Sequence, residues 1–141
     1  MIMITRTSPY PAFALAAALV AGSAARAQDH ALASRQDNQG QLMVSVTPVI
    51  TPGAATWRFD MQFNTHVSPI TQNIAADSVL SDDKGHEEAP TAWQGDPPGG
   101  HHRKGALLFK AFSPAPASIT LKVRKVGSIP ERTFTWKLND R

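Results

Sequence analysis

The fold is decided by the stretch Trp57-Arg58-Phe59-Asp60-Met61-Gln62-Phe63-Asn64. Large apolar side chains alternate along it with polar ones, which is the two-residue period of a strand that is buried on one face. A strand with one apolar face needs a second layer to cover that face. We therefore expect the three aromatic residues and the methionine of this stretch to belong to a core between two sheets.

The same alternation returns elsewhere in the chain, and turn residues separate the segments. It is found at Leu42-Val44-Val46, Ile119-Leu121-Val123 and Phe134-Trp136-Leu138, and shorter strands are expected over 75–80, 86–93 and 106–112. About seven short strands with regular turns predict an antiparallel β-sandwich of the immunoglobulin-like kind. We expect this domain to span residues 41–141, and a small closed β-barrel is the alternative.

Residues 1–27 have the three parts of a cleavable signal peptide. Arg6 precedes an apolar run over residues 12–21, and Ala25-Arg26-Ala27 has the small-x-small pattern of a cleavage site. The apolar run of about ten residues is too short for a membrane anchor, which needs roughly twenty. We expect a periplasmic or secreted protein that has no membrane span once the leader is removed.

Charge and composition exclude several functional classes. The chain carries a net charge of +3, and removal of Arg6 and Arg26 with the leader lowers it to 3 − 2 = +1. No clustered basic face is present, so nucleic acid is not an expected partner. The chain contains no cysteine, which excludes disulfides, thiolate metal ligands and thiol catalysis. No enzyme motif is present and we expect no enzyme, while the polar residues 28–40 predict a flexible lead-in.

The longest irregular stretch offers a candidate metal site. It runs from Trp93 to Gly105, and its Asp-Pro-Pro-Gly-Gly segment is followed directly by His101 and His102. His66 follows the most clearly predicted strand, and loops of a sandwich gather at its two ends. Three neutral imidazoles suit copper or zinc, so we expect His66, His101 and His102 to bind a transition metal, copper before zinc.

The alternative is that this loop has a structural role. Adjacent residues of an extended chain point to opposite faces, which separates His101 from His102 unless the backbone bends. On this hypothesis Arg103 pairs with Asp96 or another nearby acid, and Trp93 covers the edge of the core. The protein would then be a protein–protein interaction module without a metal, whose exposed edge strand receives an exported partner protein.

Two further cation sites are weaker hypotheses. Cleavage after Ala27 would place His30 third in the mature chain, where the terminal amine, two amides and the imidazole form a four-nitrogen set for copper or nickel. A second group is rich in acids and lies around an expected hairpin turn at 81–85. These acids could hold calcium, although a solvated turn at a sheet edge is the better interpretation of the group Asp77, Asp82, Asp83, Glu87 and Glu88.

Part of the chain resembles a family of exported bacterial proteins. The shared features lie within residues 63–136, and the most specific is W-x-G-x-P-P-G-G-H-H-R-x-G, here Trp93 through Gly105. The others are Thr65-His66, Asp82-Asp83-Lys84-Gly85, Gly127 and Pro130-Glu131-Arg132. Relatives tend to carry an acid where this chain has Asn64 before the Thr-His pair. The resemblance implies a small exported β-domain and no particular activity.

Overall fold

The computed structural model describes residues 30–138 of the chain. The expected signal peptide at 1–27 and the first two residues of the expected mature chain lie outside the described residues. Within them the chain forms ten strands. These are β1 (His30–Ala31), β2 (Arg35–Gln39), β3 (Leu42–Ile50), β4 (Thr56–Thr65), β5 (Ser78–Asp82), β6 (Glu87–Glu88), β7 (Ala92–Gly95), β8 (His102–Lys110), β9 (Ser118–Val126) and β10 (Ile129–Lys137).

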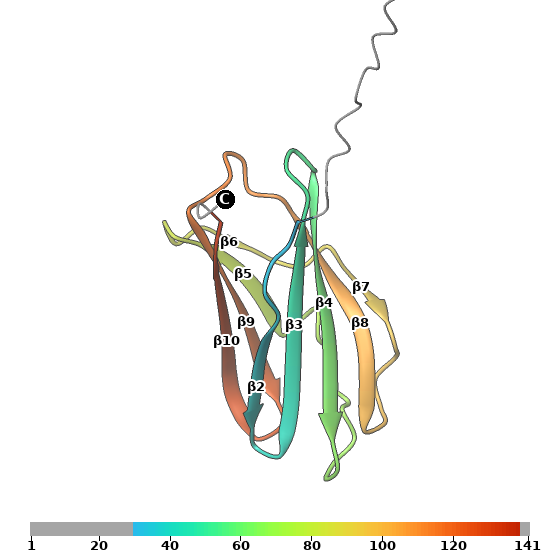
Figure 1. Ribbon diagram of the computed structural model, residues 1–141. Coiled ribbons are helices and arrows are strands. Elements are labelled where there is room, and N and C mark those ends of the chain that lie inside the picture. The colour runs from blue at the N-terminus through green and yellow to red at the C-terminus, as the bar shows by residue number, and fades with distance from the viewer. Residues whose placement is uncertain (1–29, 139–141) are drawn as a thin grey trace, which may run out of the picture.

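The strands form two antiparallel sheets that face each other as a β-sandwich (Figure 1). One sheet has the order β1-β3-β4-β8-β7 with β2 also paired to β3, and the other has the order β10-β9-β5-β6. Leaving aside β1, β2 and β6, the first sheet holds the first, second, fifth and fourth of the remaining strands in chain order, and the second sheet holds the seventh, sixth and third. This is the order of a constant-type immunoglobulin domain. The sandwich prediction is confirmed, and the barrel alternative is wrong because the sheets do not close.

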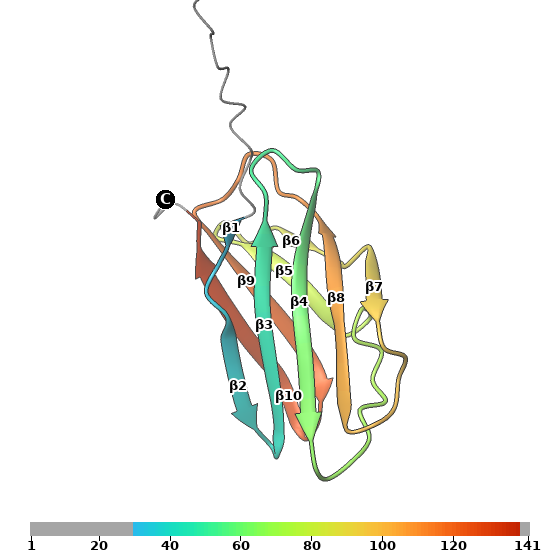
Figure 2. The same cartoon turned by 45° about the vertical axis from the view of Figure 1, so that its right-hand side comes forward.

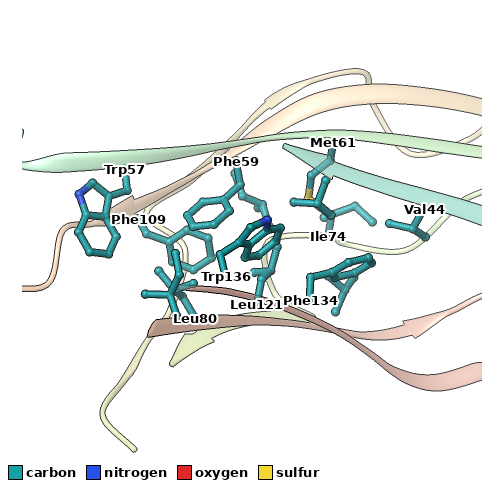
Figure 3. Packing of buried hydrophobic residues seen from close by; sticks show 14 of the residues in the cluster. Val44, Trp57, Phe59, Met61, Ile74, Leu80, Phe109, Leu121, Phe134 and Trp136 are labelled. Carbon is teal, nitrogen blue, oxygen red and sulfur yellow. The ribbon is translucent and has the colours of Figure 1, made fainter. Parts of the chain in front are cut away.

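The core lies between the sheets and contains the side chains that the alternation predicted. Trp57, Phe59, Met61 and Phe63 are at most 3% exposed, whereas Arg58 and Gln62 between them are exposed. The facing sheet contributes the apolar residues of β9 and β10, so that Phe59 packs against Trp136 with ring centroids 5.9 Å apart (Figure 3). The core is therefore built by both sheets from their alternating positions.

The structure differs from the expectation of a flexible segment at 28–40. Arg35–Gln39 form β2, which pairs with β3 and returns through a turn in which Gly40 and Gln41 both have positive φ, at 60° and 59°. Four of the five β2 residues are exposed, so the strand lacks an apolar face and gives no alternation signal. Its backbone pairing and the contact between Asp37 and Arg132 hold it in place.

The expected return strand at 86–93 is divided between the two sheets. Asp82–Gly85 form the predicted turn, and β6 pairs with β5 directly after it. The chain then crosses at Pro90 to the other sheet, where β7 pairs with β8 (Figure 2). Both pieces lie at sheet edges, as expected for a strand that contains a proline. No helix of the described residues is long and apolar enough to cross a membrane.

Candidate functional site

The candidate site lies at the end of the sandwich where the loop from β4 to β5 meets the loop from β7 to β8. β4 ends at Thr65 and β8 begins at His102, and the two strands are antiparallel neighbours (Figures 1 and 2). Their register pairs Asn64 with His102. His66, which follows β4, is therefore carried to the start of β8, although the two histidines are far apart in the sequence.

The loop from β7 to β8 is fastened to the loop from β4 to β5 by backbone hydrogen bonds. The N–H of Thr65 donates to the carbonyl of His101 at 2.9 Å, and the N–H of Ile70 donates to the carbonyl of Gly100 at 2.9 Å. The N–H of Gly99 donates in return to the carbonyl of Ile70 at 2.8 Å. Gly99 and Gly100 have φ values of 122° and 71°, a conformation that glycine adopts without steric cost. These backbone hydrogen bonds therefore fix the two loops to each other.

Arg103 lies beneath these loops and is only 2% exposed. Its guanidinium donates to the carbonyls of Gln72 at 2.6 Å and Ile70 at 3.4 Å, and its Nε donates to the carbonyl of Asp96 at 3.2 Å. Burial lowers the pKa of Arg103, while the nearby charge of Asp96 raises it. Arg103 is thus bonded to Asp96, but to its backbone carbonyl and not to its carboxylate. The Asp96 carboxylate instead accepts the N–H of Lys104 at 2.8 Å.

Trp93 completes the bracing of this end. Its indole N–H donates to the carbonyl of Asp96 at 2.9 Å, and the guanidinium carbon of Arg103 lies 5.3 Å from a Trp93 ring centroid. The six-membered ring of the indole packs on Gly105, where an added Cβ would overlap it. Phe63 lies edge-on to Trp93 with ring centroids 6.3 Å apart. The glycine is required because the indole occupies the space of a side chain.

His66 and His102 come together at the surface of this braced end. Their ring centroids are 6.2 Å apart with an interplanar angle of 81°, and both residues are exposed. The Nδ1 of His102 lies 2.7 Å from the Oδ1 of Asn64. Because an amide oxygen only accepts, Nδ1 is the donor, and in the neutral ring the Nε2 of His102 then carries a lone pair. This is the tautomer in which a histidine ligates a metal through Nε2.

The structure does not assemble the expected set of three histidines. Residues 30–138 contain no group of three or more histidine, aspartate or glutamate side chains placed to hold one metal ion. The His66–His102 pair is formed, while His101 is exposed and contributes its backbone carbonyl to the loop contact. The physical reason is that His101 lies in a bend just before β8, outside the register that pairs Asn64 with His102.

His30 lies far from this pair. It begins β1 and pairs with Ile50, at the opposite end of β3 from Leu42, which pairs with Thr65. The other members of the expected four-nitrogen set, Gln28 and Asp29, lie outside the described residues. The copper or nickel hypothesis for the mature N-terminus therefore stays a prediction, separate from the His66–His102 pair.

The acid-rich hairpin forms a turn that uses its own carboxylate. Asp82 accepts hydrogen bonds from the N–H groups of Lys84 at 2.9 Å and His86 at 2.8 Å, and its Oδ2 lies 2.7 Å from the Nδ1 of His86. Burial raises the pKa of Asp82, but the hydrogen bonds from His86 and Lys84 outweigh it and lower the pKa. The solvated-turn interpretation accounts for these contacts, and the carboxylate is already engaged.

The contacts of two residues were not predicted from the sequence. Asn64 is one: its position at the polar end of the β4 alternation placed it on the outer face, but its partner His102 depends on the register between β4 and β8. Arg132 is the other. It was noted only as part of the resemblance, yet it is 1% exposed and pairs with Asp37.

Comparisons with protein-family models, with curated proteins and with solved structures find no match to this chain. The family resemblance from the sequence therefore stays a prediction. What the protein binds has to be inferred from its own residues, and the paired histidines are the group whose chemistry points to a ligand.

Proposed function

We propose that this protein is an exported accessory module that binds a transition-metal ion, copper before zinc, through His66 and His102. One observation carries the proposal, the approach of the two exposed imidazoles to 6.2 Å with the Nε2 of His102 left free by Asn64. The remaining residues of the loop have packing roles. Arg103 and Trp93 are used in bracing, whereas neither exposed ring is needed to hold the loops together.

The distance between the rings is close to what a shared metal requires. Two imidazoles bound to one ion at about 2 Å per bond have centroids roughly 4.5–6 Å apart, depending on the angle at the metal. The observed 6.2 Å lies just beyond this range. His66 is exposed, so rotation about its side-chain bonds closes the gap without disturbing the core or the bond between His102 and Asn64.

The available ligand chemistry selects the class of metal. The chain has no cysteine, so a thiolate site for zinc or cuprous copper is excluded. Neutral imidazole nitrogens suit copper(II) and zinc. The proposed location outside the cytoplasm is oxidising, which favours copper(II), and it rests on the signal peptide expected at residues 1–27. Asn64 acts as an orienting residue, since it fixes the ring of His102 through Nδ1.

The proposal is tested by calorimetric titration of copper(II) and of zinc into purified mature protein. We expect saturable binding that is lost in the double variant His66→Ala/His102→Ala, and we expect Asn64→Ala to weaken binding about 10-fold or more. His86→Ala is the matched control, because His86 is exposed but bonds to Asp82 away from the pair. Equal heats for the unmodified protein and the double variant would remove the proposal.

The second candidate is a protein–protein interaction module that binds no metal. It is favoured by the extent of the bracing, in which Arg103, Trp93 and the loop backbone all serve to hold the shape of this end. The edge strand β7 would then receive the partner, as in strand addition. Pro90 and Pro97-Pro98 flank β7 and shorten the edge that it offers, which makes this candidate weaker than metal binding.

A further inference from the structure

We infer that a second copy of the chain completes the metal site, so that one ion joins two protomers through His66 and His102 of each. This inference rests on the proposed metal binding at the pair. The His66–His102 pair of one protomer supplies fewer ligands than a closed metal site needs. The pair offers two ring nitrogens, while zinc in a closed protein site takes four ligands and copper(II) takes four strong ligands in a tetragonal arrangement.

A second copy supplies what is missing with the same chemistry. Two pairs related by a two-fold axis through the ion give four imidazoles, and a two-fold interface brings the same surface of both protomers together. Asn64 leaves the Nε2 of His102 free in each protomer. The four imidazole nitrogens complete the ligand set of the ion, and no further ligand from either protomer is needed. This suits a chain that contains no cysteine and so offers no thiolate.

The surface around the pair can be approached by a second copy. His66, His101 and His102 are exposed, and they lie at one end of the sandwich. Val67 follows His66 directly. Its side chain is 58% exposed, which makes it the most exposed large apolar side chain among the described residues. Apolar contact between the two Val67 side chains would bury them next to the bridging ion.

The rigidity of this end lowers the cost of association. The backbone next to each histidine is already bonded, since the carbonyl of His101 accepts the N–H of Thr65 and the carbonyl of Gly100 accepts the N–H of Ile70. Arg103 holds the same loops from below. Binding therefore orders two side chains in each protomer and little backbone, which is the advantage of a preorganised site.

The test measures the mass of the mature protein by light scattering during size exclusion, with copper(II) alone, with zinc alone and with chelator. We expect a doubling of mass with either metal, half an ion per chain by calorimetry, and return to the monomer on chelation. The single variants His66→Ala and His102→Ala should remain monomeric, whereas His86→Ala should dimerise. Val67→Asp should weaken the metal-dependent dimer by about 10-fold or more while still binding the ion.

The outcomes separate this inference from the proposed function. One ion per chain in a monomer overturns the second copy and leaves metal binding at the pair intact. No metal binding overturns both. A dimer that forms equally well in the presence of chelator, or in the double variant His66→Ala/His102→Ala, overturns the metal bridge. Half an ion per chain together with a doubled mass supports both.

Discussion

The two buried arginines of this protein, Arg132 and Arg103, meet their charge in different ways. Arg132 is 1% exposed, and its Nη1 lies 2.8 Å from the carboxylate of Asp37. Arg103 is 2% exposed, donates to backbone carbonyls and lies against the ring of Trp93. Arg132 is therefore part of an ion pair, while Arg103 donates its hydrogen bonds to neutral carbonyls, with the charge of Asp96 nearby.

The two arginines connect different elements of the fold. Arg132 on β10 bonds to Asp37 and to the carbonyls of Gln39 and Leu42, so it ties β2 and the start of β3 to the opposite sheet. Arg103 ties one loop to another at the end that carries the histidines. In a chain without disulfides, buried guanidinium groups with several acceptors take over the task of cross-linking elements.

The largest expected effect is the removal of the paired arginine. Arg132→Ala removes the ion-pair partner of Asp37 and takes the guanidinium donor away from three backbone carbonyls, so we expect a loss of about 3–5 kcal/mol in the free energy of unfolding. Urea denaturation measures it. The control Arg124→Ala breaks the exposed pair with Glu131 and should cost about 1 kcal/mol or less. Equal losses for the two variants would contradict this comparison.

The second effect is expected from removal of Arg103, whose hydrogen bonds go to backbone carbonyls. Arg103→Ala breaks one buried bond, to Ile70, and two part-buried bonds, to Gln72 and Asp96, but leaves no carboxylate without an ion-pair partner, so we expect a smaller loss of about 2–3 kcal/mol in the free energy of unfolding. Trp93 loses the cation from its ring, and its fluorescence should change. Arg103→Lys should recover less than half of the loss, because lysine cannot reproduce the fork of donors. A loss larger than that of Arg132→Ala would reverse the ranking.

The third effect tests the packing of the Trp93 indole against Gly105. In Gly105→Ala the new methyl group would overlap the indole and would lie 2.8 Å from the carbonyl of Gln94. We expect a loss of about 1–3 kcal/mol in the free energy of unfolding, as for overpacking in a core. Thermal unfolding measures it, and the double variant Trp93→Leu/Gly105→Ala should lose less than the two single variants added together. Strict additivity would show that the indole is not the obstacle.

The smallest effect concerns the turn at Asp82, far from both arginines. Its pKa is lowered from 3.8 in the folded protein by hydrogen bonds that are lost on unfolding, so its contribution to stability is present above about pH 4 and disappears as the pH falls through the lower folded value. Asp82→Asn should therefore flatten the dependence of unfolding free energy on pH in the acidic range. Asp83→Asn is the matched control at the next position, and an identical flattening there would remove the assignment to Asp82.

Much of the fold was predictable because alternation is a local property. The period of two in β3, β4, β9 and β10 placed their apolar residues in the core, and the structure confirms it. β2 was missed because an exposed polar strand carries no such period and is held by pairing and by Arg132. The division of the return strand at Pro90 between two sheets was missed for a related reason, since no local signal says which sheet a short strand joins.

The candidate site was predictable only in part. The positions of His66 and His102 after and before strands suggested that they could meet, but the third ligand His101 does not join them, and the role of Asn64 was not foreseen. Arg103 was expected to pair with the Asp96 side chain and instead bonds to its carbonyl. These details depend on strand register and loop backbone geometry, which the residue types alone leave open.

The sequence by itself determined that this chain forms a sandwich of alternating strands with an apolar core and that any metal would be held without thiolate. Both follow from residue types and their spacing along the chain, which need no knowledge of distant contacts. The tertiary structure decided that His66 meets His102, that Asn64 sets the tautomer of His102, and that two arginines are buried. These are outcomes of the pairing of β4 with β8 and of β2 with β3, where the position of one residue depends on a partner far away in the chain.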